Sequence, residues 1–407
     1  MKWMQKIVLV LVLMFLVSIS ITNSKNNAAL VGISQTMSPG NYVVIGWNDL
    51  GMHCMGKDYS SICILPPYNN LWAQVIHRGN PPSIVTTGIN LAYSFQNNSY
   101  SVGKINFWSY DSALFGVNLP DNTGLTGLGL TGNLTWNGTA FEARGVPLTG
   151  YDDGSTIEQA YQLARVALTF SSSAMMLDST MFVAPVSVEM NCALCHSAGA
   201  GPTVYDNILR LHDSEEGTNL FNTKPILCAK CHASNALGMS GTPGLPSLSQ
   251  AMHGFHASEV PSISCYNCHP GVTTQCLRGA MYLAGKTCTN CHGTIAQVAN
   301  SISTGRRPWL DEPRCANCHT STYAENSGVL YRNSTGHGGV YCEACHNSTH
   351  AELPTVQPRD GIQAFRLQGT ATPLSNCMIC HTVMPTSPGP HGKAPTAVSK
   401  WKHYDMK

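Results

Sequence analysis

The stretch His337-Gly-Gly-Val-Tyr-Cys342-Glu-Ala-Cys345-His346 contains the pattern that decides how this chain is organised. Two cysteines three positions apart are followed directly by a histidine. This pattern occurs roughly 0.03 times in a random chain of the same cysteine and histidine frequencies. Here it occurs seven times, as Cys192-Ala-Leu-Cys195-His196, Cys228-Ala-Lys-Cys231-His232, Cys265-Tyr-Asn-Cys268-His269, Cys288-Thr-Asn-Cys291-His292, Cys315-Ala-Asn-Cys318-His319, Cys342-Glu-Ala-Cys345-His346 and Cys377-Met-Ile-Cys380-His381.

The spacing within each motif suits covalent attachment of haem. Two thiols three residues apart reach both vinyl groups at one edge of the ring, and the adjacent histidine then donates an imidazole nitrogen to the iron. A zinc ribbon does not require a histidine after every second cysteine, and a disulfide scaffold does not explain the histidines either. We therefore predict seven haems c, held by the fourteen motif cysteines and by the proximal histidines His196, His232, His269, His292, His319, His346 and His381.

Nine further histidines are available for the opposite face of each iron. Six of them lie among the motifs, and three of these six precede a glycine, which lets the backbone approach a haem closely. The predicted distal ligands are His53, His212, His253, His256, His337, His350 and His391. For the seventh position His53 is one candidate, and His77, His403, a methionine or a neighbouring subunit are the alternatives. An open sixth position at one iron, which would be a catalytic site, also fits the sequence.

The N-terminal half has a different pattern. Alternating apolar residues from Ile89 to Phe95 and again from Val166 to Phe170 are typical of strands with one buried face. Asn137-Gly138, between two apolar runs, predicts a type I′ hairpin. We predict a mainly-β, sandwich-like domain over residues 30–188. A heptahaem domain over residues 189–407 follows, with short helices and little regular structure, because Gly, Pro, Ser and Thr interrupt its apolar runs.

The first 29 residues are typical of an export signal. Lys2 and Lys6 precede a fifteen-residue apolar run from Ile7 to Ile21, which is shorter than the about 20 residues of a membrane span. A cleaved signal is the preferred interpretation, and an uncleaved anchor is the alternative. The chain is thus expected at the cell surface or outside the cell, or in a periplasm-like space. A formal net charge of +1 gives no indication of nucleic-acid binding.

Three cysteines lie outside the motifs. Cys54 and Cys63 are close in sequence, and in an exported chain they are candidates for a disulfide. Cys276 then has no partner and no assigned role. Paired carboxylates, a Ser-His-Asp set and nucleotide-binding fingerprints do not stand out in the sequence.

The C-terminal half resembles the multihaem c-type cytochromes of respiration on periplasmic or extracellular acceptors, and it is also similar to extracellular cytochromes that polymerise into filaments. The resemblance rests on the motifs and on segments such as His337 to His346 with the trailing His350. A looser similarity to cytochromes of metal-reducing prokaryotes covers Gly46 to Met55 and Ile64 to Asn69. The family implies electron transfer, with redox proteins or extracellular acceptors as partners and with self-association in a filament. The other two hypotheses are an oxidoreductase acting on a small nitrogen or sulfur compound and an adhesive surface component.

Overall fold

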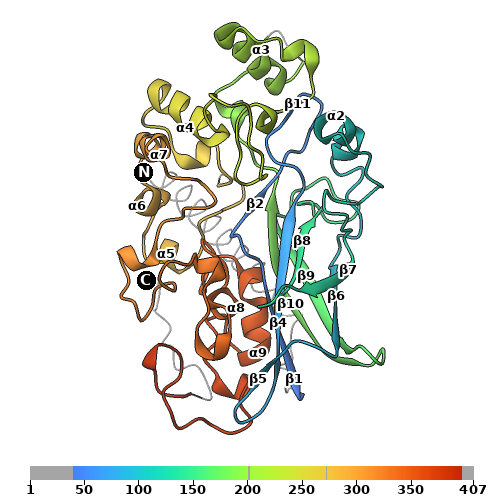
Figure 1. The fold of residues 1–407 in the computed structure, drawn as a ribbon, viewed down its shortest axis with the longest axis vertical. Coiled ribbons are helices and arrows are strands. Elements are labelled where there is room, and N and C mark those ends of the chain that lie inside the picture. The colour runs from blue at the N-terminus through green and yellow to red at the C-terminus, as the bar shows by residue number, and fades with distance from the viewer. Residues whose placement is uncertain (1–39, 200–201, 272, 397–407) are drawn as a thin grey trace, which may run out of the picture.

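The computed structural model describes residues 40–199, 202–271 and 273–396 of the chain. Figure 1 shows a strongly curved sheet along one side of the molecule and a layer of short helices and loops along the other. The predicted export signal and His403 lie outside the described residues.

Nine strands form the main sheet, in the order β1-β4-β8-β7-β6-β9-β10-β2 with β5 paired to β4. The pairings are antiparallel except for β10 with β2. The sheet curls into a half-barrel, so the Val44 N–H on β1 donates to Asp178 Oδ2 on β10 at 2.8 Å. The strands are β1 (Tyr42–Trp47), β2 (His53–Cys54), β4 (Asn69–His77), β5 (Ser83–Val85), β6 (Ile89–Phe95), β7 (Gly132–Trp136), β8 (Phe141–Val146), β9 (Tyr161–Phe170) and β10 (Met176–Ser187).

The predicted alternation is confirmed in β6, whose even positions are exposed or half-buried while Ile89, Leu91, Tyr93 and Phe95 are buried. The predicted hairpin is confirmed as well, because β7 and β8 pair with Trp136 opposite Phe141. Its turn is not type I′, since only Gly138 has a positive φ. The Asn137 side chain instead accepts the N–H groups of Thr139 and Ala140, which sets a four-residue loop.

The second layer consists of single helical turns and short helices, as predicted. The longest described helix, α3, has 13 residues. The helices are α2 (Asp111–Phe115) beside the sheet, then α3 (Val204–Glu216), α4 (Leu248–Glu259), α5 (Ala280–Leu283), α6 (Cys288–His292), α7 (Ile295–Ser303), α8 (Cys342–His346) and α9 (Ile362–Gln368). Lone 3₁₀ turns lie between them, and no described helix is long and apolar enough to cross a membrane.

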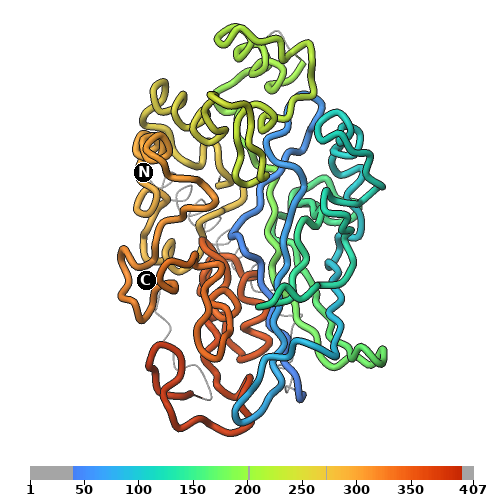
Figure 2. Tube along the Cα trace, viewed as in Figure 1, coloured from blue at the N-terminus to red at the C-terminus, as the bar shows by residue number. Residues whose placement is uncertain are grey.

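Several contacts join the layers, and two of them show how the sheet meets the second layer. On the face of β1 and β4 that points away from the main core, Trp47 and Trp72 pack around Tyr341, with ring centroids 5.2 and 6.2 Å from it. The segment between β1 and β4 also crosses into the second layer, where β3 (Ile62–Cys63) pairs in parallel with β11 (Ile226–Leu227). Figure 2 shows this segment as the blue tube that rises among green and yellow turns. The sheet is therefore the support for the second layer.

Candidate haem sites

All seven motifs adopt the same local structure. The first cysteine begins a 3₁₀ turn at five motifs and a five-residue α-helix at the other two, α6 and α8. In the five 3₁₀ motifs the histidine N–H donates to the carbonyl of the first cysteine at 2.8–3.0 Å. Residues three and four apart lie on one face of a helical turn. Each motif therefore presents two thiols and one imidazole on the same side, as thioether attachment and proximal ligation require.

Six motif histidines lie opposite one of the other histidines of the second layer. In each pair the two ring centroids are 5.8–6.3 Å apart. The pairs are His196 with His256, His232 with His212, His269 with His253, His292 with His350, His346 with His391 and His381 with His337. These six partners are the candidate distal ligands of the second layer. Their assignment to particular motifs could not be read from the sequence.

The spacing of the pairs fits an iron between the rings. A metal–imidazole bond is about 2 Å long and a ring nitrogen lies about 1.2 Å from the centroid, so two imidazoles on opposite sides of one metal have centroids about 6 Å apart. Direct stacking would bring the rings closer than this. The residues present therefore fit seven proximal and six distal haem ligands.

Hydrogen bonds at Nδ1 orient several of the distal histidine rings, so that Nε2 points away from the backbone acceptor. His253 and His256 on α4 contact the carbonyls of Ser249 and Met252, each one turn earlier, at 2.8 Å. His391 Nδ1 lies 2.7 Å from the Thr322 carbonyl. A ring nitrogen that donates to a carbonyl fixes the tautomer and leaves the other nitrogen free for a metal.

Burial keeps the most enclosed rings neutral. It is the main cause that lowers the pKa of His346 and His350 to about 4, and a neighbouring histidine contributes less to the same shift. Imidazole must be neutral to bind a metal. At neutral pH these rings are therefore in the form that ligation requires.

The fifth motif of the sequence differs. His319 is exposed, and the part of the chain that the structure describes places no second imidazole against it. His53, the candidate from sequence, is buried in β2 with its Nε2 3.5 Å from Asp49 Oδ1, and its strand partner is Val186 on β10. His77 is exposed at the end of β4, against the Tyr42 ring. The source of this ligand stays a prediction.

Neighbouring motifs follow one another in a single series. Burial is the main cause that raises the pKa of several motif cysteines. A nearby cysteine of another motif raises the pKa further. The pairs are Cys228 with Cys192, Cys192 with Cys268, Cys265 with Cys288, Cys291 with Cys318, and Cys345 with Cys380. Buried Tyr331 lies near both Cys315 and Cys342 and joins the fifth motif to the sixth. With the motifs numbered in sequence order, these neighbours connect them as 2-1-3-4-5-6-7.

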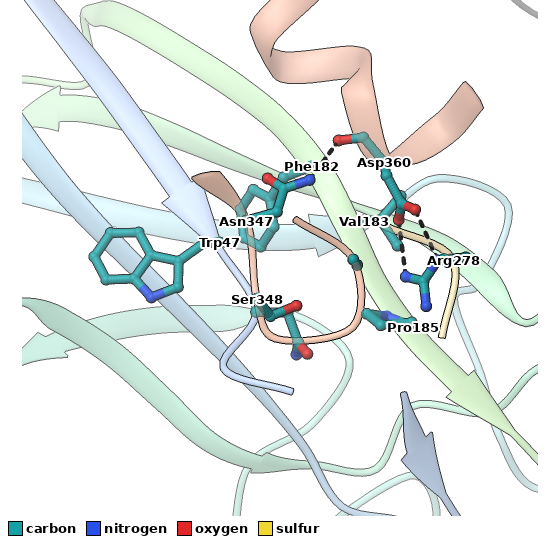
Figure 3. Close-up of a pocket in the computed structure, with 10 residues that line it drawn as sticks. Trp47, Phe182, Val183, Pro185, Arg278, Asn347, Ser348 and Asp360 are labelled. Carbon is teal, nitrogen blue, oxygen red and sulfur yellow. Dashed lines mark hydrogen bonds and ion pairs between the residues drawn. The ribbon is translucent and has the colours of Figure 1, made fainter. Parts of the chain in front are cut away.

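A buried ion pair of the second layer lies beside the middle of this series and contacts the sheet domain. The Arg278 guanidinium binds Asp360 through two hydrogen bonds of 2.7 and 2.9 Å and donates to the Gly51 carbonyl at 2.5 Å. Figure 3 shows the pair beside a cavity of about 10 Å³, which has room for about one water molecule. This cavity cannot hold a substrate.

The predicted disulfide between Cys54 and Cys63 is wrong, because both thiols are free. The reason is the strand pairing: β2 carries Cys54 to β10, whereas β3 carries Cys63 to β11. Cys276, which had no role in the sequence, lies against His350 with Sγ 3.6 Å from Nδ1.

Comparison with known proteins agrees with this geometry. A sequence model of the family described as cytochrome c7 and related cytochrome c matches residues 309–382, which contain the last three motifs together with His337 and His350. No curated protein and no solved structure matches the chain. Over residues 309–382 the chain is thus similar to c-type cytochromes, and the repeated motif and the ring pairs agree with covalently bound haem and haem-based electron transfer.

Proposed function

We propose that the chain is an electron conduit outside the cytoplasm, with seven haems c held in one continuous series. The observation that carries this proposal is the set of six imidazole pairs, each made of one motif histidine and one other histidine about 6 Å away. When bound, each haem supplies a one-electron iron couple. The residues of the chain attach the ring, close both iron faces and keep adjacent motifs together, which favours electron transfer over chemistry at iron.

Export of the chain is part of the same proposal. Covalent multihaem attachment matches the export signal predicted for residues 1–29. The partners would be redox proteins or extracellular electron acceptors. The ends of the series are the second motif, near α3, and the seventh, just beyond the end of β4, where the Thr382 N–H donates to the Gly79 carbonyl at 3.1 Å. Electrons would enter at one of these ends and leave at the other.

We also propose that copies of the chain associate into a filament. Within the described residues His319 has no imidazole partner, while His77 is exposed and takes part in no ring pair with a motif histidine. A histidine of a neighbouring copy, such as His77, would complete the iron at His319. His403 of the same chain is the alternative donor.

Negative-stain microscopy of the purified holoprotein tests the filament, and His77→Ala and His403→Ala identify the donor. If His77 of a neighbouring copy is the donor, we expect His77→Ala to convert filaments into monomers with loss of one low-spin signal. If His403 is the donor, His403→Ala should lose that signal without a change in assembly. Monomers at every concentration and salt, with seven low-spin haems, would rule out a ligand from a neighbour.

One observation favours a second function. An exposed His319 without an opposing ring also fits an iron that binds a small substrate, such as a nitrogen or sulfur oxyanion. Protein-film voltammetry separates the two functions. Reversible waves that account for seven electrons support the conduit, whereas a catalytic current on addition of nitrite or sulfite would establish the enzyme and contradict a conduit.

A further inference from the structure

Cys276 occupies a special position beside the fourth motif of the sequence. Its Sγ lies 3.6 Å from Nδ1 of His350, and the His350 ring lies 6.1 Å from the ring of His292. The inference below rests on the proposed function, in which His292 and His350 ligate one iron. With Nε2 on the iron, Nδ1 carries the proton of the neutral ring and donates it to the sulfur.

Three of the other five distal histidines have stronger acceptors. His253, His256 and His391 each direct Nδ1 at a backbone carbonyl, at 2.7–2.8 Å. A thiol sulfur is a weak acceptor by comparison. A hydrogen bond from the non-ligating nitrogen to a strong acceptor makes the imidazole a more basic ligand. The ring of His350 is therefore the least basic of these four.

The contact is not a loose one. The backbone N–H groups of Arg278 and Gly279 both donate to the His350 carbonyl at 2.8 Å, and His350 has a φ of 73°. A Cβ on Gly51 would collide with the Thr349 carbonyl and with His350 Cβ, so the loop also fits tightly against the sheet domain. The segment after Cys276 and the loop at Gly51 thus both hold His350 in place.

We propose that Cys276 is a positioning residue that raises the reduction potential of the iron between His292 and His350 above the potentials of the irons ligated by His253, His256 and His391. A less basic imidazole stabilises ferric iron less, so the ferrous state is favoured. The step is the gain of one electron by ferric iron. No bond breaks, and Nδ1 keeps its proton in both states.

The position of this iron in the series indicates what a higher reduction potential would do. The motif of His292 is the fourth of seven in the spatial series, with three motifs on either side. A site of higher potential in the middle of a conduit holds an electron there while the two ends exchange with partners. The chain would then store charge at its centre.

Two substitutions of Cys276 in the holoprotein test this role. Cys276→Asn places an amide oxygen, a stronger acceptor of similar size, at Nδ1, and Cys276→Ala removes the acceptor. In a spectroscopic redox titration we expect a roughly threefold to tenfold lower ferrous-to-ferric ratio for one haem in Cys276→Asn at fixed potential, where tenfold corresponds to about 59 mV for one electron. In Cys276→Ala the ratio of the same haem should rise.

Cys63→Ala is the matched control, since Cys63 is a buried free thiol in β3. Cys63 lies near Cys228 of the second motif, so this variant should leave the potential of the iron between His292 and His350 unchanged. A merely structural role would shift the potential in the same direction in both Cys276 variants, and that result, or no shift, would overturn the proposal. If Cys276→Asn fails to fold, an unchanged potential in Cys276→Ala is sufficient to reject it. Absence of haem in the unsubstituted protein would instead refute the proposed function.

Discussion

Strand β4 and helix α4 show how differently the two layers are built. In β4, eight of nine residues are buried by protein, whereas the twelve residues of α4 include no buried side chain. Yet α4 carries His253 and His256, which face motif histidines of two different motifs. The sheet is stabilised by its own apolar side chains. The second layer instead arranges ligands, and the apolar area that it needs comes from the haems.

Loss of haem attachment should produce the largest difference between the two layers in their resistance to limited proteolysis. In a host that cannot attach haem, residues 189–396 should lose their protection against limited proteolysis, because few of their side chains are buried by protein. Residues 40–188 should remain resistant. Mass spectrometry of the fragments measures this difference. Equal resistance of both regions without haem would show that the second layer has a protein core after all.

Breaking the buried ion pair of the second layer, which lies against the sheet domain, should have the next largest effect. Asp360→Ala leaves the buried Arg278 guanidinium without its carboxylate partner, which should cost about 3–5 kcal/mol of unfolding free energy. Denaturant unfolding of the holoprotein, followed by tryptophan fluorescence, measures it.

The matched control for Asp360 is Asp311→Ala. Asp311 is paired with Arg307 at the surface, and no resolvable change in the unfolding midpoint is expected. If the two variants unfold at the same midpoint, the buried pair of Arg278 and Asp360 contributes no more to stability than the exposed pair of Arg307 and Asp311 does.

Glu189 should show a smaller, pH-dependent effect at the boundary between the layers. Burial opposes its ionisation, but N–H donors from Thr273 and Thr274 outweigh this and lower the pKa to about 2. Since the pKa of an unfolded glutamate is about 4.3, ionised Glu189 stabilises the fold above that pH, and this contribution is lost as the pH falls towards 2. Glu189→Gln should cost about 1.5–3 kcal/mol at pH 7.

Unfolding as a function of pH tests this role, with Glu215→Gln on the exposed side of α3 as control. The Glu189→Gln variant should converge with the parent protein near pH 2, while the control follows the parent throughout. A constant difference between Glu189→Gln and the parent at every pH would mean that the charge is not responsible.

The sequence predicts local features well and long-range pairing poorly. The alternation in β6 depends on adjacent residues, so it could be read directly, and the same is true of the motif turns. The Cys54–Cys63 disulfide failed because strand pairing with distant β10 and β11, not closeness in sequence, decides where the thiols lie. Likewise, nothing in the sequence connects His350 to His292, or Arg278 to Asp360, since a folded sheet is needed to bring them together.

The imidazole pairs are the main support for the conduit, and low-temperature EPR of the oxidised, purified holoprotein tests them. We predict low-spin signals typical of two imidazole ligands for at least six of the seven haems, with any different signal confined to the haem at His319. High-spin signals from two or more haems would show that the paired histidines do not close the irons, and would contradict the conduit.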